Sequence, residues 1–453
     1  MRFALRTLLA IILWCGTGDL LAAPIAAEFP PGLQVPADAR PGPSFDVDKA
    51  TAAYMALLSP EQRQRSDAYF EGGYWIRLWQ FLYGLGVAAV FLLTGLSRRM
   101  RDIAERVSAR PWLYTLIYAA LWVVAGFALS LPLAIYAGFF REHAYGLSEQ
   151  PFGSWLWDQV KGLGVGLVLA PLAITAVYAA VRRAGARWWI WATGLFFLFF
   201  VFVTMIAPVF IAPLFNKYQP LPDGPVRDAV LSLARANDIP TGHLEWFDAS
   251  KQTTRISANV SGMFGTTRLS LNDNLLKRTS LPEIKAVLGH EMGHYVLSHA
   301  LQLTVYLTLV FGICFALLNR GFERALARWG ARLGIRDRAD PAALPLAIAI
   351  LSVILFVGGP LVNAIVRQAE NQADAYGLNA AREPYGFAMV SMRLSTYRKI
   401  QPGPIEEILF YDHPSGYERV HRSMVWLKEN ASPRLASEAA AANSRSSSSI
   451  AGR

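Results

Sequence analysis

The chain has 453 residues, of which 53% are hydrophobic and only 17% charged. Because soluble globular chains carry about 25% charged residues, this composition argues against a soluble protein and indicates one built into a lipid bilayer. The formal net charge is +10. The basic residues gather in short loops between apolar runs, so a membrane-topology signal explains them better than nucleic-acid binding does. The two cysteines, Cys15 and Cys314, indicate neither a disulfide framework nor a thiolate metal site.

The first 23 residues have the layout of an export signal. A basic start, a short apolar run and small residues at Ala22 and Ala23 follow one another in this order. A retained first membrane helix is the alternative, but the apolar run is short for a span. We therefore expect a signal peptide over residues 1–23, followed by an extramembrane segment over residues 24–73.

Six long apolar segments follow, each long enough or nearly so for a spanning helix of about 20 residues. They lie at 74–96, 111–140, 155–181, 188–215, 301–318 and 344–366. We expect four membrane helices within residues 74–215 and two within residues 301–366. The predicted fold class is therefore mainly α, with multiple membrane-spanning helices. Residues 431–453, rich in Ser and Ala, are expected to be disordered.

Residues 216–300 are more polar, and we expect them to form a small α+β domain. Their patterns predict one helix and two short strands, at 226–236, 243–247 and 268–271. A longer helix then begins near Leu281. Ser280 is a suitable N-cap for it, and Glu283 has the spacing of a capping box.

The charges of the loops predict which side of the membrane this polar domain occupies. Basic residues follow the first, third and fifth spans: Arg98, Arg99, Arg101, Arg106, Arg110, Arg182, Arg183, Arg187, Arg320, Arg324, Arg328, Arg332, Arg336 and Arg338. All three loops fall on one side, which the positive-inside rule makes cytoplasmic. We therefore expect an integral protein of a bacterial inner membrane whose polar domain faces the periplasm.

The predicted helix from Leu281 contains the motif His-Glu-Met-Gly-His at 290–294. Positions i and i+4 share one face of a helix, so His290 and His294 can hold one metal ion. A catalytic zinc site takes nitrogen ligands and keeps a position open for water, and Glu291 can act as general base on that water. Small and apolar neighbours indicate a packed environment, where unpaired His and Glu would be costly. The motif therefore predicts a zinc-dependent endopeptidase rather than two solvated histidines.

A third protein ligand is needed, and Glu370 is the candidate, because it emerges after the last span on the same side as the motif helix. Asp374 lies one helical turn further on and could orient a ligand histidine through its ring N–H. Later in the chain, His413 and Arg419 could stabilise an oxyanion or hold a substrate carboxylate. For all four residues a solvated surface position is the alternative. His299 lies five residues past His294, on another face of the helix, and is not expected to be a ligand.

These motifs together resemble the type I CAAX prenyl protease family, which are membrane-embedded zinc proteases of the gluzincin kind. The matching segments are 211–217 with 222–224, Ser257-Ala258-Asn259, 287–294, 370–374, and His413-Pro414 followed by Glu418-Arg419. The resemblance implies a helical barrel that encloses a chamber, with a small α+β gluzincin catalytic domain over residues 216–300 and a further catalytic part over residues 367–430.

The resemblance also implies roles for individual residues. Zinc would be held by His290, His294 and Glu370, with Glu291 as the base. Asp374 would support a ligand, while Asn259, His413 and Arg419 would contact the substrate or the transition state.

In this family the active site faces the cytosol, whereas the loop charges here predict an active site on the outer side of the membrane. We therefore expect exported or membrane proteins as substrates rather than prenylated cytosolic ones. Two alternatives stay open. One is processing of lipidated C-termini. The other is a transport or binding protein that uses the chamber. Charges within spans would favour transport, but Arg77, Asp158 and Lys161 all lie near span ends.

Overall fold

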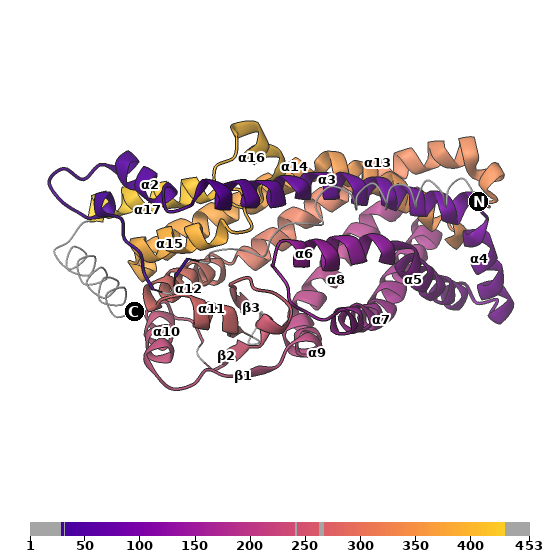
Figure 1. Ribbon diagram of the computed structural model, residues 1–453. Coiled ribbons are helices and arrows are strands. Elements are labelled where there is room, and N and C mark those ends of the chain that lie inside the picture. Colours follow the sequence, from indigo (N-terminus) through magenta and orange to yellow (C-terminus); the bar gives the residue numbers. More distant parts are fainter. Residues whose placement is uncertain (1–28, 31, 241, 262–266, 431–453) are drawn as a thin grey trace.

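The structure, a computed structural model, describes residues 29–30, 32–240, 242–261 and 267–430. The expected signal peptide over residues 1–23, Cys15 within it and the tail over residues 431–453 lie outside the described residues. Figure 1 shows a bundle of long helices joined to a small sheet with its own shorter helices. The predicted fold class, mainly helical with a small α+β part, is confirmed.

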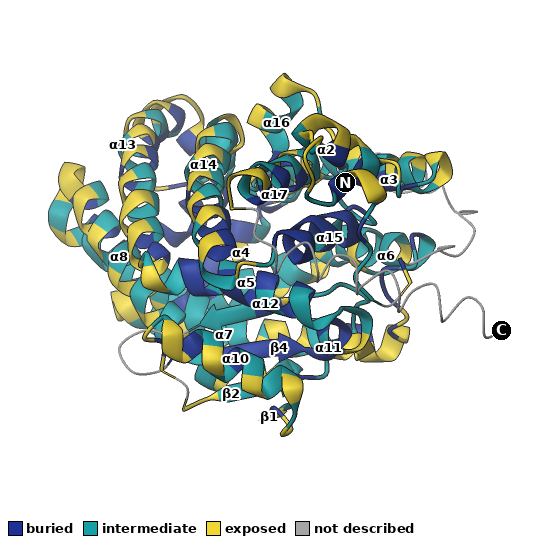
Figure 2. Ribbon diagram, turned by 90° about the vertical axis from the view of Figure 1, so that its left-hand side faces the viewer, coloured by how far each residue is buried: buried dark blue, intermediate teal, exposed yellow. Residues whose placement is uncertain are grey.

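Five continuous helical stretches are long and apolar enough to cross a membrane: Pro60–Leu93, Pro111–Ala144, Phe152–Phe215, His299–Leu333 and Pro341–Ala381. The third has 64 residues and contains two predicted spans, which the turn Gly185–Arg187 separates and which pack against each other. The six predicted segments thus overlap α3 (Pro60–Leu93), α5 (Pro111–Ile135), α7 (Phe152–Ala184), α8 (Trp188–Ile206), α13 (His299–Leu333) and α14 (Leu344–Ala381). Their outer faces carry exposed residues (Figure 2), among them many large apolar side chains, as lipid-facing helices require.

The first of these helices begins earlier than its apolar run. Ser59 caps α3 in a capping box with Gln62, and Pro60 occupies the first turn. The boundary expected at residue 73 therefore falls inside α3, because an apolar-run criterion misses its polar first turns.

The described part of the N-terminal segment packs on the C-terminal helices. It contains α2 (Val47–Met55), and its apolar residues share a core with α15 (Pro384–Leu394) and α17 (Gly416–Asn430). Arg393 fastens it, donating hydrogen bonds to the carbonyls of Phe29 and Gly32 while pairing with Glu283. The segment before the first span is thus part of the folded extramembrane portion.

The polar domain is built around a four-stranded sheet in the order β1-β2-β4-β3. The strands are β1 (Tyr218–Pro220), β2 (Leu244–Phe247), β3 (Ala258–Ser261) and β4 (Arg268–Asn272). Strands β2 and β4 are parallel, and the outer pairs are antiparallel. The apolar sides of α10 (Pro225–Ala236) and α12 (Leu281–Val296) share one core with the sheet. The predicted helix and the two predicted strands are confirmed as α10, β2 and β4, whereas β1 and β3 were not predicted.

The remaining helices are short connections: α4 (Leu96–Val107), α6 (Arg141–Ala144), α9 (Ala212–Phe215), α11 (Asp273–Arg278) and α16 (Pro404–Phe410). Single helical turns and π-helical turns complete the path, at Ala37–Ala39, Tyr136–Phe140, Ala207–Ile211, Ala249–Lys251 and Pro341–Ala343. Cys314 is buried within α13.

Candidate active site

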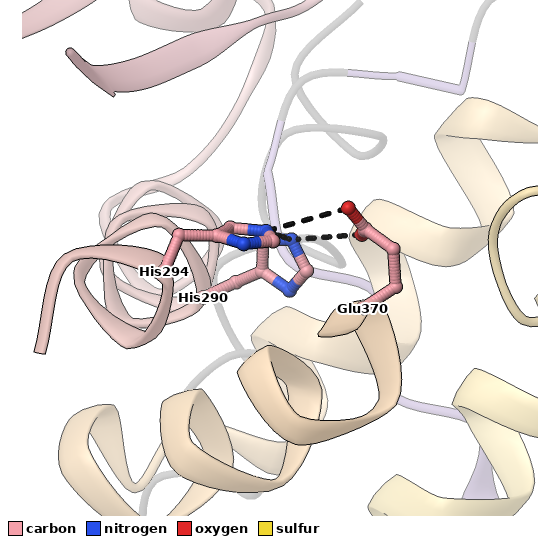
Figure 3. A group of neighbouring side chains, drawn as sticks. All are labelled: His290, His294 and Glu370. Atoms are coloured by element: carbon pink, nitrogen blue, oxygen red, sulfur yellow. Dashed lines mark hydrogen bonds and ion pairs between the residues drawn. The ribbon is translucent and has the colours of Figure 1, made fainter. Parts of the chain in front are cut away.

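The three predicted metal ligands lie together where α12 meets α14 (Figure 3). The Nε2 atoms of His290 and His294 are 3.2 Å apart. The Glu370 carboxylate faces both rings, with Oε2 3.3 Å from His290 Nε2 and Oε1 3.4 Å from His294 Nε2. One donor atom from each residue lies within 4.8 Å of the other two. Two imidazoles and a carboxylate in this arrangement suit a metal ion that accepts nitrogen and oxygen ligands.

Small residues make this meeting of helices possible. A Cβ added at Gly293 would lie 3.0 Å from the Cα of Ala373, and one added at Gly377 would lie 2.6 Å from the backbone nitrogen of His290. The two backbones therefore nearly touch, as small residues at a helix interface allow. Because α12 carries the histidines and α14 carries Glu370, this close approach sets the distances among the ligands.

Both histidines have their second ring nitrogen engaged. His290 Nδ1 lies 2.8 Å from Asp374 Oδ1, and a carboxylate can only accept, so Nδ1 carries the proton. His294 Nδ1 lies 2.9 Å from His299 Nδ1, while His299 Nε2 lies 3.0 Å from Gln372 Oε1. If Gln372 accepts through this oxygen, His299 accepts from His294. Both ligand rings then direct bare Nε2 lone pairs at the same point, which is the tautomer that metal binding needs.

The neighbouring carboxylates favour a proton on His290. Burial lowers the pKa of His290, but the hydrogen bonds to Asp374 and Glu370 outweigh it and raise the pKa to about 9. A cation at this position would replace that proton, since metal ligands must be deprotonated.

His299 makes a contact that reasoning from the sequence did not predict. The helical-wheel argument assumed one continuous helix, but α12 ends at Val296 and Ser298 has a left-handed backbone with φ of 56°. The chain turns there and α13 begins at His299 itself. His299 is not among the grouped ligands, as expected, yet it touches a ligand and fixes its ring, which no motif signalled.

Two arginines and a histidine surround the two carboxylates of α14. Arg419 on α17 places Nη2 3.2 Å from Glu370 Oε2 and Nε 3.0 Å from Asp374 Oδ2. Arg422, one turn later, lies 3.4 Å from Asp374. His413 Nε2 is 3.3 Å from Glu370 Oε2, and its Nδ1 contacts Asp412 at 2.8 Å. The structure therefore brings His413 and Arg419 to the site, and it adds Arg422, whose position no motif predicted.

Glu291 lines a cavity of about 240 Å³ together with His290, Asp374, His413 and Arg419. Burial raises the pKa of Glu291, although His290 and His294 act to lower it. Its carboxylate makes no hydrogen bond within the described part of the chain. A carboxylate that is partly buried, unengaged and next to a ligand can exchange protons with a reactant in the cavity.

Asn259 lies on β3, opposite Ser270 of β4. From this strand, Ala258 lines the cavity and Asn259 does not. Because side chains alternate along a strand, Asn259 points to the other face from Ala258. Of the predicted site residues, Asn259, His294 and Glu370 do not line this cavity, but the last two face His290 at its edge.

The sequence matches two family models of membrane metallopeptidases. Residues 47–217 match the family model of the CAAX prenyl protease N-terminal region, described as five membrane helices, and residues 220–424 match peptidase family M48. The chain belongs to peptidase family M48. It is a membrane metalloendopeptidase, as its motifs predicted, and M48 metallopeptidases are zinc enzymes.

Two relatives and one solved structure show the extent of the likeness. The chain is 29% identical over 351 residues to the "Uncharacterized metalloprotease YhfN" of Bacillus subtilis, covering 76% of this chain and 82% of that protein. It is 31% identical over 169 residues to CAAX prenyl protease 1 of Saccharomyces cerevisiae, covering 37% of each. The crystal structure of S. mikatae Ste24p aligns with a TM-score of 0.68 at 22% identity, over 81% of this chain and 89% of that one. This last likeness shows a shared fold.

Proposed function

We propose that this membrane endopeptidase holds one zinc ion between His290, His294 and Glu370. The observation that carries the proposal is the pair of facing Nε2 atoms, 3.2 Å apart, on rings whose Nδ1 atoms are both engaged. Two ring nitrogens at this distance need a proton or a metal ion between them, and the Glu370 carboxylate, 3.3 and 3.4 Å from the two nitrogens, completes a set of metal ligands. The donor set is that of a catalytic zinc site with three protein ligands and one open position.

Bound zinc would supply a Lewis acid that polarises the scissile carbonyl and makes a water molecule more acidic. Glu291 would take the proton from the attacking water and pass it to the leaving amine. Its raised pKa suits it to both steps, since an acid–base group works best near the ambient pH. Asp374 would hold the ring of His290, as hydrogen-bonded carboxylates do for metal-bound histidines.

His413 and Arg419 would act on the substrate side of the centre. Arg419 pairs with two buried carboxylates and borders the cavity, so its guanidinium can help stabilise negative charge that develops at the reacting carbonyl. His413 lies between Asp412 and Glu370 and borders the cavity. Strand β3 is an edge of the sheet, so an extended peptide could pair with its free backbone. Asn259 on this strand would then contact the substrate backbone.

The orientation we propose places the metal site on the periplasmic side of a bacterial inner membrane. The basic loops contact one another: Arg336 pairs with Glu105 at 2.6 Å, and Arg101 pairs with Asp340 at 2.7 Å. Figure 1 shows α4, which carries two of these residues, at one end of the long helices and α12 toward the other. Reporter fusions at Gly224 and in the loop 320–338 test this. An inside signal at Gly224 with an outside signal in the loop would overturn it.

Exported or membrane proteins are the substrates we propose for such a site. The alternative is a lipidated C-terminus, which is favoured by the relatives named as CAAX prenyl proteases. Cleavage of a farnesylated peptide and of an unfolded, unmodified protein, measured side by side with the purified chain, separates the two. Faster cleavage of the unmodified protein is expected, and activity confined to the farnesylated peptide would decide for the alternative.

The zinc ligands themselves can be tested by metal content. His294→Ala and Glu370→Ala should each lose zinc during dialysis against a chelator, while Glu418→Ala, a neighbouring carboxylate outside the ligand set, should retain it. Zinc retained in Glu370→Ala would exclude Glu370 as a ligand. A protein that binds no zinc in any form but keeps its cellular function would favour the transport or binding alternative.

A further inference from the structure

A second cavity, of about 270 Å³, lies among the membrane helices α7, α8, α13 and α14 (Figure 1). Its lining is apolar and includes Val181, Trp188, Leu318 and Leu351. It is larger than the cavity of about 150 Å³ that accepts benzene in an engineered protein. Side chains facing an unfilled space of this size lose packing contacts, so an apolar ligand would be stabilised there.

The cavity lies at the level where these helices leave the hydrocarbon. On α7 the apolar run ends at Val181, directly before Arg182, and on α13 it ends at Leu318, shortly before Arg320. Trp188 begins α8 at the same level, as tryptophans of membrane interfaces do. From Ala173 to Val181 the groove follows α7 for about 12 Å. An acyl chain entering from the adjacent leaflet can therefore lie along it.

Arg338 adds a charge to this apolar lining. Its Nη2 pairs with Glu323 at 3.2 Å, whereas its Nη1 is buried and has no hydrogen-bond partner among the described residues. Arg182 follows the lining residue Val181, but it does not line the cavity and its Nη2 donates to Thr115 on α5. A guanidinium with a free N–H at the edge of an apolar cavity is suited to a phosphate group.

We propose that this cavity binds a phospholipid with an anionic headgroup, whose acyl chain lies between α7, α8, α13 and α14 and whose phosphate lies on Arg338. The basic loops at this end favour such a lipid over a zwitterionic one, whose headgroup brings its own cation. This lipid site lies apart from the metal centre. The lipid proposal therefore does not depend on the proposed peptidase activity.

Titration of the purified full chain in uncharged detergent, followed by native mass spectrometry, tests the proposal. The probes are phosphatidylglycerol and phosphatidylcholine with identical acyl chains. One molecule of phosphatidylglycerol should bind per chain, and its affinity should be at least tenfold higher than that of phosphatidylcholine. Arg338→Gln should remove this preference, whereas Arg328→Gln, an exposed arginine of the same side that does not line the cavity, should keep it.

Two further variants separate lipid binding from a structural ion pair. Glu323→Gln breaks the pair but frees Arg338, so it should bind phosphatidylglycerol as tightly as the wild type or more tightly. Ala347→Trp fills the cavity and should lower the binding affinity for both lipids at least tenfold. The proposal is overturned if Arg338→Gln keeps the preference, if Glu323→Gln weakens binding as much as Arg338→Gln does, or if Ala347→Trp changes nothing.

Discussion

Replacing Gly377 with alanine tests whether the contact between α12 and α14 builds the metal site. A Cβ at this position would lie 2.6 Å from the backbone nitrogen of His290 and 2.9 Å from the carbonyl carbon of Gly289. Both are backbone atoms of α12, which cannot rotate away as a side chain can. Reaching an ordinary contact of 3.4 Å from 2.6 Å requires the helices to separate by about 0.8 Å.

This separation is large for a metal site. Ligand distances must hold within about 0.2 Å, and Glu370 lies on α14 whereas His290 and His294 lie on α12. We therefore expect zinc affinity to fall at least about tenfold, which corresponds to ~1.4 kcal/mol. Overpacking should also destabilise the fold by ~1–3 kcal/mol.

The assay is competition for zinc against a chelator of known affinity, with thermal unfolding in detergent measured alongside. Gly359→Ala is the matched control, because it lies on the same helix and nothing lies within 4 Å of its added Cβ. It should leave zinc affinity unchanged. Wild-type zinc affinity in folded Gly377→Ala would refute the idea that this contact sets the ligand distances.

Two other substitutions test the surroundings of the site. His299→Phe removes the partner of His294 Nδ1 and should weaken zinc binding by about 10–100-fold, measured by the same competition; unchanged affinity would mean that His299 does not orient the ligand. Glu283→Gln breaks a buried pair with Arg393 in which Glu283 is 0% exposed, so unfolding should be easier by ~3–5 kcal/mol. Asp223→Asn, from the exposed pair with Arg227, should cost at most ~1 kcal/mol. If Glu283→Gln and Asp223→Asn lowered the free energy of unfolding equally, burial would not be what makes the Glu283–Arg393 pair important.

Local chemistry made much of the site predictable. The spacing of His290 and His294, the cap at Ser280 and the turn between Glu370 and Asp374 are properties of single helices, and the structure keeps all three. Apolar runs likewise located the long helices that are candidate membrane spans, because a span requires length and composition that few other segments have.

What the sequence did not reveal depends on contacts between distant segments. Strands β1 and β3 have three and four residues, and they are strands through their pairing with β2 and β4, which no local pattern shows. His299 reaches His294 only because the chain turns at Ser298. Arg419 was predicted to meet the substrate, and its present partners, Glu370 and Asp374, follow from how α17 packs beside α14.

The most direct test of the central claim is Glu291→Gln, assayed for zinc content and for cleavage of casein. Glutamine is nearly isosteric but cannot take a proton from water. The protein should retain wild-type zinc, because Glu291 is not among the ligands, while cleavage falls by about 10²–10⁴-fold, the usual contribution of a general base. Cleavage near the wild-type rate would contradict the assignment of Glu291 as the base.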